Sequence, residues 1–159
     1  GLRISTIKHA HHAFDIDIVA QQRTRRLARL NGVFDRVHVG GLCDLSNLRR
    51  LAGPQTLVVS DCEGCEATLL DPAKVPALSS TDLLVELHDF LDPTITETMH
   101  ARFAATHQIS TFVMSARASY STPELDRLTP RERELATWEG RPAGMTWVWM
   151  TARSQEVVV

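Results

Sequence analysis

The sequence predicts an α/β fold with a doubly wound, mostly parallel sheet that ends in an antiparallel pair of strands. Three observations support this prediction. Short apolar runs alternate with stretches of helical period along most of the chain. Acidic residues directly follow several of these runs, which is where open α/β sheets carry their polar sites. Two further strand-like runs then close the chain, and we expect them to pair antiparallel at one end of the sheet.

The predicted strands are short runs rich in apolar and β-branched residues. The last of them, Thr-Trp-Val-Trp-Met-Thr, is apolar on both faces, as a strand inside a sheet would be. The strands are predicted at residues 11–17, 37–39, 56–60, 83–85, 109–114 and 146–151.

The predicted helices are recognised by their periodicity and by their end signals. A helix follows Asp17 and stops at Gly32, because glycine readily adopts the left-handed conformation of a helix C-cap. Shorter helices are predicted at 45–51 and 67–70, and a further helix buries the stripe Ile95, Met99 and Phe103.

Two helix starts match the capping box, in which a Thr and a Glu three residues later satisfy each other's backbone N–H groups. Thr94 and Glu97 form the first such pair, directly after a proline that suits a first helical turn. Thr129 and Glu132 form the second, and we expect that helix to run to about Trp138.

Composition and charge limit the classes of function. The chain has 159 residues, of which 43% are hydrophobic and 23% charged, as in one ordinary domain covering residues 1–159. A net charge of −2 gives no reason to expect a nucleic acid or an anionic membrane as partner. We find neither an apolar run of membrane-spanning length nor a signal-peptide layout, and we therefore expect a cytoplasmic protein.

The three cysteines are expected to be reduced thiols, since their number is odd and no export signal accompanies them. Cys62 and Cys65 form a C-x-x-C, a pattern that can serve redox chemistry or zinc. Neighbouring carboxylates disfavour a redox thiolate, and Cys43, the only other cysteine, follows a different predicted strand. We expect small buried residues in a tight turn.

Two predicted strands end in residues that carry chemistry. Asp61 and Glu63 follow one strand, and His88 follows the other between Glu86 and Asp89. A histidine accepts protons near neutral pH, and a carboxylate can act as a base. Glu63 and His88 could also hold a divalent metal, although we assign no metal ligand. Structural roles stay open as well, with Glu63 in a helix-capping turn and His88 bonded to a loop.

Several motifs together resemble a known family. They are residues 13–17, 27–33, 61–66, 85–88 and the closing strand around 147–149. In this order and spacing, the chain resembles the class I S-adenosylmethionine-dependent methyltransferases, and particularly their FkbM-like branch. The resemblance implies a Rossmann-like sheet of strand order 3-2-1-4-5-7-6, in which the last strand is antiparallel.

The resemblance begins only at the end of the family's first helix. Residues 1–10 precede the first predicted strand and contain no Gly-x-Gly. The resemblance therefore implies a domain that is N-terminally incomplete, without the first strand and the Gly-rich cofactor loop. Strands two and four would then be about 9–10 Å apart, with unpaired edges that favour self-association or marginal stability.

The resemblance also implies roles for the acidic residues. Asp15 is the candidate for the ribose of the cofactor, and Asp17 either joins it or caps the following helix. Asp44 lies near the adenine or caps the next helix. Asp61 would line the methyl site and the cofactor, with Glu63 or His88 as the base.

The function implied by the resemblance is methyl transfer from S-adenosylmethionine to a small-molecule acceptor, at oxygen. The catalytic candidates are Asp61, Glu63 and His88, and the cofactor-binding candidates are Asp15, Asp17, Asp44 and Asp61. The alternative is a non-catalytic, truncated methyltransferase-like module that binds a partner or needs another chain to complete its sheet.

Overall fold

The computed structural model describes residues 10–113, 122–137 and 145–153. The chain divides into two compact units, residues 1–48 and 49–159, and each is described by itself. Whether the two units together form the single domain predicted for residues 1–159 depends on how they join, so this stays a prediction. Within the described residues, no helix is both long and apolar enough to cross a membrane.

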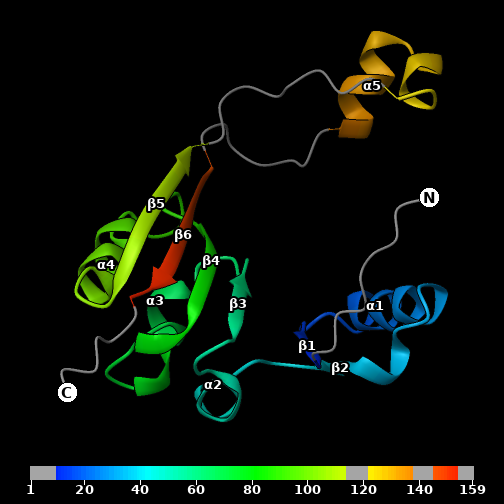
Figure 1. Cartoon of the computed structure of the whole chain (residues 1–159). Helices are drawn as coiled ribbons and strands as arrows, with labels where there is room; N and C mark the ends of the chain where they lie inside the picture. Colours follow the sequence, from blue (N-terminus) through cyan, green and yellow to red (C-terminus); the bar gives the residue numbers. More distant parts are fainter. Residues whose placement is uncertain (1–9, 114–121, 138–144, 154–159) are drawn as a thin grey trace. The chain divides into compact units, whose positions relative to one another are not determined.

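The first unit is a parallel β-α-β arrangement (Figure 1). Strands β1 (His11–Phe14) and β2 (Val37–Gly40) pair in parallel, and helix α1 (Ile18–Leu30) connects them together with the short turn η1 (Phe34–Arg36). The helix ends as predicted, because Gly32 follows the C-cap with a φ of 67°.

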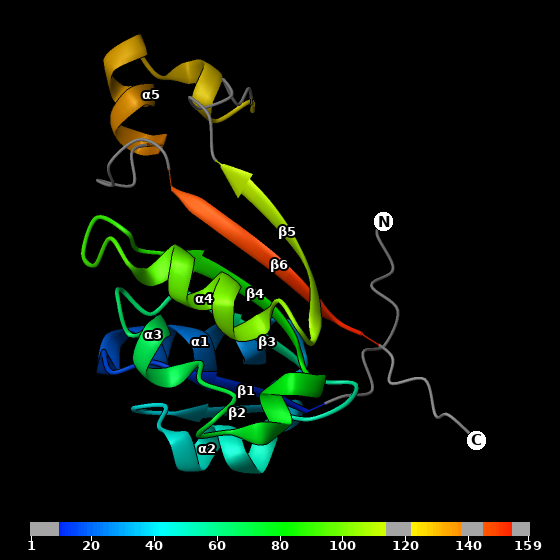
Figure 2. The ribbon, with the colours of Figure 1, turned by 90° about the vertical axis from the view of Figure 1, so that its left-hand side faces the viewer.

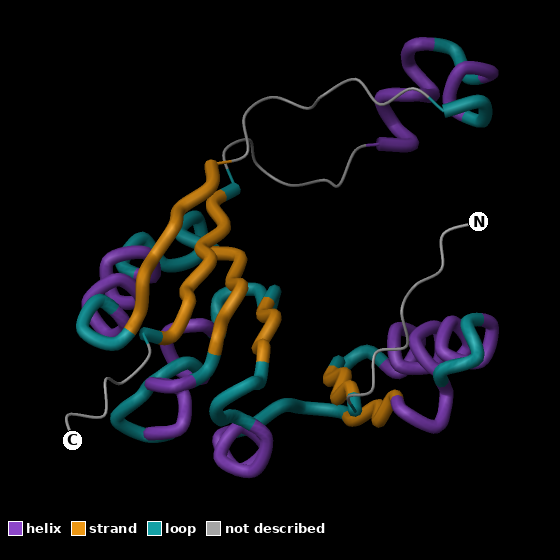
Figure 3. Tube along the Cα trace, in the orientation of Figure 1, coloured by secondary structure: helices purple, strands orange, loops and turns teal. Residues whose placement is uncertain are grey.

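The second unit contains a four-stranded sheet of order β3-β4-β6-β5 (Figure 3). Strand β3 pairs in parallel with β4, whereas β6 is antiparallel to both β4 and β5. The strands are β3 (Leu57–Ser60), β4 (Asp82–Leu87), β5 (His107–Val113) and β6 (Thr146–Ala152). This confirms the predicted α/β class, with parallel strands first and an antiparallel C-terminal pair.

Helices α3 (Glu66–Leu69) and α4 (Ile95–Phe103) lie on the same face of this sheet (Figure 2). The predicted stripe of α4 is fully buried against it, as are the sheet residues that alternate toward that face. Helix α2 (Leu45–Leu51) crosses the boundary between the units, and the short turn η2 (Pro76–Ser80) precedes β4. The core of the unit includes Leu83, Val85, Leu87, Val148, Met150, Ile95, Met99 and Phe103.

One predicted capping box forms and the other does not. Helix α5 (Pro130–Thr137), which follows the turn η3 (Leu125–Arg127), begins with the reciprocal pair: Thr129 N and Oγ1 both donate to Glu132, and Glu132 N donates back to Thr129 Oγ1 at 3.3 Å. The predicted end at Trp138 lies just outside the described residues, as does Met114 of the predicted fifth strand.

The capping box predicted at Thr94 is wrong. Thr94 Oγ1 donates instead to Asp92 Oδ1 at 2.7 Å, so that the hydroxyl points away from the helix. Asp89 takes over the first turn of α4, where its carboxylate accepts the N–H of Thr96 at 2.9 Å. An aspartate near the helix start has thus replaced the threonine as the acceptor for the orphan N–H groups.

Candidate functional site

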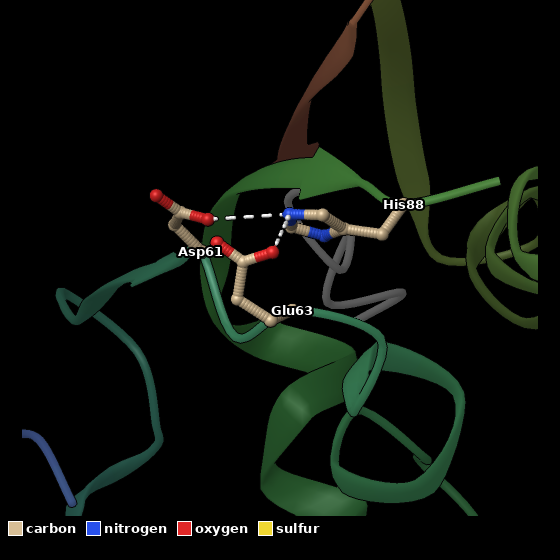
Figure 4. Close-up of side chains that lie close together, drawn as sticks. All are labelled: Asp61, Glu63 and His88. Carbon is tan, nitrogen blue, oxygen red and sulfur yellow. Dashed lines mark ion pairs between the residues drawn. The ribbon is translucent and has the colours of Figure 1, made fainter. Parts of the chain in front are cut away.

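The carboxyl ends of β3 and β4 bring three predicted site residues together. The strands are parallel and Ser60 lies opposite Val85, so the segments that follow them leave the sheet at the same edge. His88 Nε2 lies 3.4 Å from Asp61 Oδ1 and 3.4 Å from Glu63 Oε2. Figure 4 shows the two carboxylates pointing at the same nitrogen from one loop.

The imidazole of His88 is held from its other side by Glu66. Its Nδ1 is hydrogen-bonded to Glu66 Oε1, and both side chains are fully buried. The same Glu66 oxygen accepts the N–H of Gly64 at 3.3 Å. One buried carboxylate therefore fixes both the ring and the loop that carries Glu63.

The loop turns sharply at Glu63 and Gly64. Both residues have positive φ values, 52° and 94°. Glycine adopts this conformation freely, whereas a residue with a side chain is disfavoured there. A Cβ on Gly64 would lie 3.1 Å from a side-chain carbon of Leu91, so the turn leaves little room at that position. This turn carries the chain from β3 to α3 and directs Glu63 back toward His88.

Cys62 and Cys65 form a disulfide, and the prediction of reduced thiols is wrong for this pair. The tight turn brings the two sulfur atoms together on either side of Glu63 and Gly64. Cys43 is a free thiol, and its pKa is raised by burial and by the charge of Asp44. The C-x-x-C therefore closes the loop that carries the site.

Glu66 is the site residue that sequence reasoning missed. It lies in the first turn of α3, where an acidic side chain commonly interacts with the helix N-terminus. The sequence offered one indication of it, since Glu66 lies three residues after Glu63 and the sharp turn brings both side chains close to His88. Glu86 also approaches the ring, with Oε2 3.8 Å from His88 Nε2. Asp89 instead serves the start of α4.

The remaining candidates lie in the first unit and at its boundary. Asp15 is exposed and accepts the N–H of Asp17 at 2.8 Å. Asp17 caps α1 by accepting the N–H of Val19 at 2.8 Å. Asp44 and Asn47 exchange two hydrogen bonds at the start of α2. Asp17 and Asp44 therefore have the capping geometry that was one of their two predicted roles.

The arrangement can do two kinds of chemistry. A histidine surrounded by carboxylates can accept or pass on a proton. The same atoms can also hold a cation, because the ligand atoms of Asp61, Glu63 and His88 all lie within 4.8 Å of one another. Asp61 and Glu63 are exposed, with 40% and 61% of their side-chain surface accessible, and a ligand can reach them from solvent.

Comparisons with known proteins agree with the fold. No protein-family model and no curated protein matches the chain. The crystal structure of a domain described as a precorrin-6Y C5,15-methyltransferase, from Corynebacterium diphtheriae, is similar with a TM-score of 0.52 and 16% identity, covering 94% of this chain and 77% of that one.

A second similar structure is the O-methyltransferase TomG from Streptomyces achromogenes, involved in tomaymycin synthesis and solved with S-adenosylmethionine. Its TM-score is 0.50 and its identity 12%, and the match covers 89% of this chain and 62% of TomG. At such identities the likeness concerns the fold alone. The chain therefore has the Rossmann-like fold of class I methyltransferases.

Proposed function

We propose that this chain belongs to a cytoplasmic, FkbM-like methyltransferase that transfers a methyl group from S-adenosylmethionine to an oxygen of a small-molecule acceptor. The observation that carries the proposal is the cluster of Asp61, Glu63 and His88 at the carboxyl edge of β3 and β4. TomG, a protein of similar fold, is an O-methyltransferase that binds this cofactor, which supports the choice of reaction.

The reaction makes few demands on the protein. S-adenosylmethionine supplies, when bound, a sulfonium-linked methyl group that is open to in-line attack by an oxygen. The protein must align the acceptor hydroxyl and remove its proton. In our proposal, Asp61 orients the hydroxyl and lines the methyl site. Glu63 or His88 accepts the proton, and Glu66 keeps the His88 ring in place.

In our proposal, Asp15 binds the ribose of the cofactor. Its carboxylate is exposed at the carboxyl end of β1, and the N–H of Asp17 holds one of its oxygens. Such a carboxylate can accept hydrogen bonds from a ribose diol. Asp17 and Asp44 already cap helices, so we give their predicted cofactor role to Asp15.

Calorimetric titration of S-adenosylhomocysteine into the chain tests the proposal. We expect saturable binding that Asp15→Ala abolishes. Asp35→Ala removes another exposed aspartate of the same unit and should bind like the parent. No heat from a folded sample would contradict cofactor binding by these residues.

One structural observation favours the alternative of a non-catalytic or partner-dependent module. Among the described residues, β1 is hydrogen-bonded only to β2, and β3 only to β4. Each of these strands therefore presents an edge that another strand could pair with. If the module depends on such pairing, the chain should self-associate in sedimentation experiments. Full hydrogen-exchange protection of β1 and β3 in a monomer would argue against it.

A further inference from the structure

We propose that Asp61, Glu63 and His88 form a binding site for a divalent first-row transition-metal ion. The sequence assigned no metal ligand, and methyl transfer as proposed above needs none. The inference depends on the geometry around His88 Nε2 and not on the number of acidic residues nearby.

One buried nitrogen of the site lacks a hydrogen bond within the described residues. The side chain of His88 is fully buried, and within the described residues its Nε2 makes no hydrogen bond. Buried polar atoms without a partner are rare because each costs free energy. This nitrogen faces two carboxylate oxygens at equal distances of 3.4 Å, which is beyond a normal hydrogen bond. A cation between the three atoms would give this nitrogen a partner.

The hydrogen bond to Glu66 determines which nitrogen of the His88 imidazole carries the proton. Glu66 Oε1 is bonded to Nδ1, and a carboxylate there favours the tautomer with the proton on Nδ1. The lone pair is then on Nε2 and points at Asp61 and Glu63. A carboxylate that holds the far nitrogen of a histidine ligand is the usual support of a protein metal site, because it fixes the tautomer and the ring orientation.

The distances between the ligand atoms fit a bound metal ion. Around a tetrahedral ion whose metal–ligand bonds are about 2.0–2.1 Å long, two ligand atoms lie about 3.3–3.4 Å from each other. The observed separations between His88 Nε2 and the two carboxylate oxygens match this length. Three protein ligands leave at least one position open, and Asp61 and Glu63 are exposed enough for an ion to enter. The site is therefore of the open kind that binds a further ligand.

The donor set indicates which ion binds. Mg²⁺ and Ca²⁺ prefer oxygen ligands alone, whereas the imidazole nitrogen suits Fe²⁺ or Zn²⁺ and the two carboxylates also suit Mn²⁺. The backbone conformation of Glu63 is a further observation that supports a ligand site. Its φ of 52° is unfavourable for a residue with a side chain, and such conformations cluster at ligand sites.

The role of the ion follows only if the proposed methyl transfer is correct. A metal-bound acceptor hydroxyl would lose its proton more readily. The oxygen would then form the new bond to the methyl carbon while the sulfur–carbon bond breaks. The hydroxyl proton would go to solvent, because Glu63 and His88 as metal ligands would no longer accept it as they do in the metal-free reaction proposed above. Metal binding itself does not depend on this step.

The test measures Mn²⁺ binding by electron paramagnetic resonance on the tag-free chain, after removal of metals with a chelator and without cofactor. We expect one Mn²⁺ per chain and a nitrogen coupling from His88 in the electron spin echo. Asp61→Asn and Glu63→Gln, at exposed positions, should each weaken binding at least ~10-fold. His88→Asn should remove the nitrogen coupling.

Two variants serve as matched controls. Glu97→Gln removes an exposed carboxylate of α4, and His38→Gln removes an exposed histidine that stacks on His12 and could bind metal adventitiously. Both should bind Mn²⁺ like the parent. The proposal is overturned if the folded parent binds no stoichiometric Mn²⁺, or if Asp61→Asn and Glu63→Gln bind it undiminished.

The metal site and the proposed function can fail separately. Stoichiometric Mn²⁺ with no heat from S-adenosylhomocysteine would keep the metal site and remove the methyltransferase proposal. Cofactor binding that a chelator does not change, in a chain that binds no Mn²⁺, would do the opposite.

Discussion

His88 and Glu66 form a buried pair that joins the end of β4 to the first turn of α3, across 22 residues of sequence. Both side chains are fully buried. A pair of this kind depends strongly on both partners, because removing one leaves the other buried without compensation. The pair also connects the fold to the site, since the opposite nitrogen of the same ring faces Asp61 and Glu63.

Truncation of Glu66 should therefore destabilise the chain. Glu66→Ala is expected to lower the free energy of unfolding by about 3–5 kcal/mol, as for other broken buried pairs. Glu66→Gln keeps an acceptor for His88 and should cost less, about 1–3 kcal/mol. Urea unfolding followed by circular dichroism measures both. Glu97→Ala, at an exposed position of α4, should change stability by less than about 0.5 kcal/mol; equal effects of Glu97→Ala and Glu66→Ala would contradict the role of the pair.

Glycine should be tolerated in place of Glu63, because glycine readily adopts the left-handed backbone conformation of this residue. Glu63→Gly relieves an unfavourable φ and is expected to leave stability unchanged or raise it by up to ~1 kcal/mol. Gln55, the other non-glycine residue with positive φ among the described residues, provides a matched control with φ of 67°. Gln55→Gly should act similarly on stability. Only Glu63→Gly should weaken Mn²⁺ binding, and a loss of binding in both variants would separate the metal from Glu63.

The disulfide between Cys62 and Cys65 should be present in the isolated chain. The denatured, unreduced protein is then expected to show one reactive thiol, Cys43, and the reduced protein all three of its cysteines. Titration with a thiol reagent measures both numbers. Because the bridge closes the turn that carries Glu63, reduction should also weaken Mn²⁺ binding. Three thiols without reduction would contradict the bond.

The carboxylate of Asp71 should contribute to stability in a pH-dependent way. Burial raises the pKa of this carboxyl, but the N–H of Ala73 and the charges of Arg102 and Lys74 outweigh it and hold the pKa below its usual value. A carboxyl with a lower pKa in the folded state stabilises the fold above its unfolded value of about 3.9. This contribution is lost as the pH falls through the folded value.

Asp71→Asn should therefore lower stability at pH 7 and flatten the decline of stability between about pH 5 and pH 2. Chemical denaturation at several pH values measures this. Asp35→Asn, at an exposed position of the first unit, removes a carboxylate outside this network. A decline as steep in Asp71→Asn as in the parent would refute the assignment.

The sequence alone determined most of the local structure. Strand and helix periods are read within a few residues, so the elements from β1 to β6 could be predicted close to their observed bounds. Gly32 marked the end of α1, and Thr129 with Glu132 marked the start of α5, because these signals act over one helical turn. The strand-end positions of Asp61 and His88 followed from the same local patterns.

The tertiary structure decided which of these residues meet. Glu66 pairs with His88, and Cys62 with Cys65, only because the chain reverses at Glu63 and Gly64 with positive φ values. The capping box expected at Thr94 was lost to Asp89 and Asp92, whose positions depend on the loop after β4. Local periodicity does not encode such contacts, because they depend on where a turn and a parallel strand pairing bring distant side chains together.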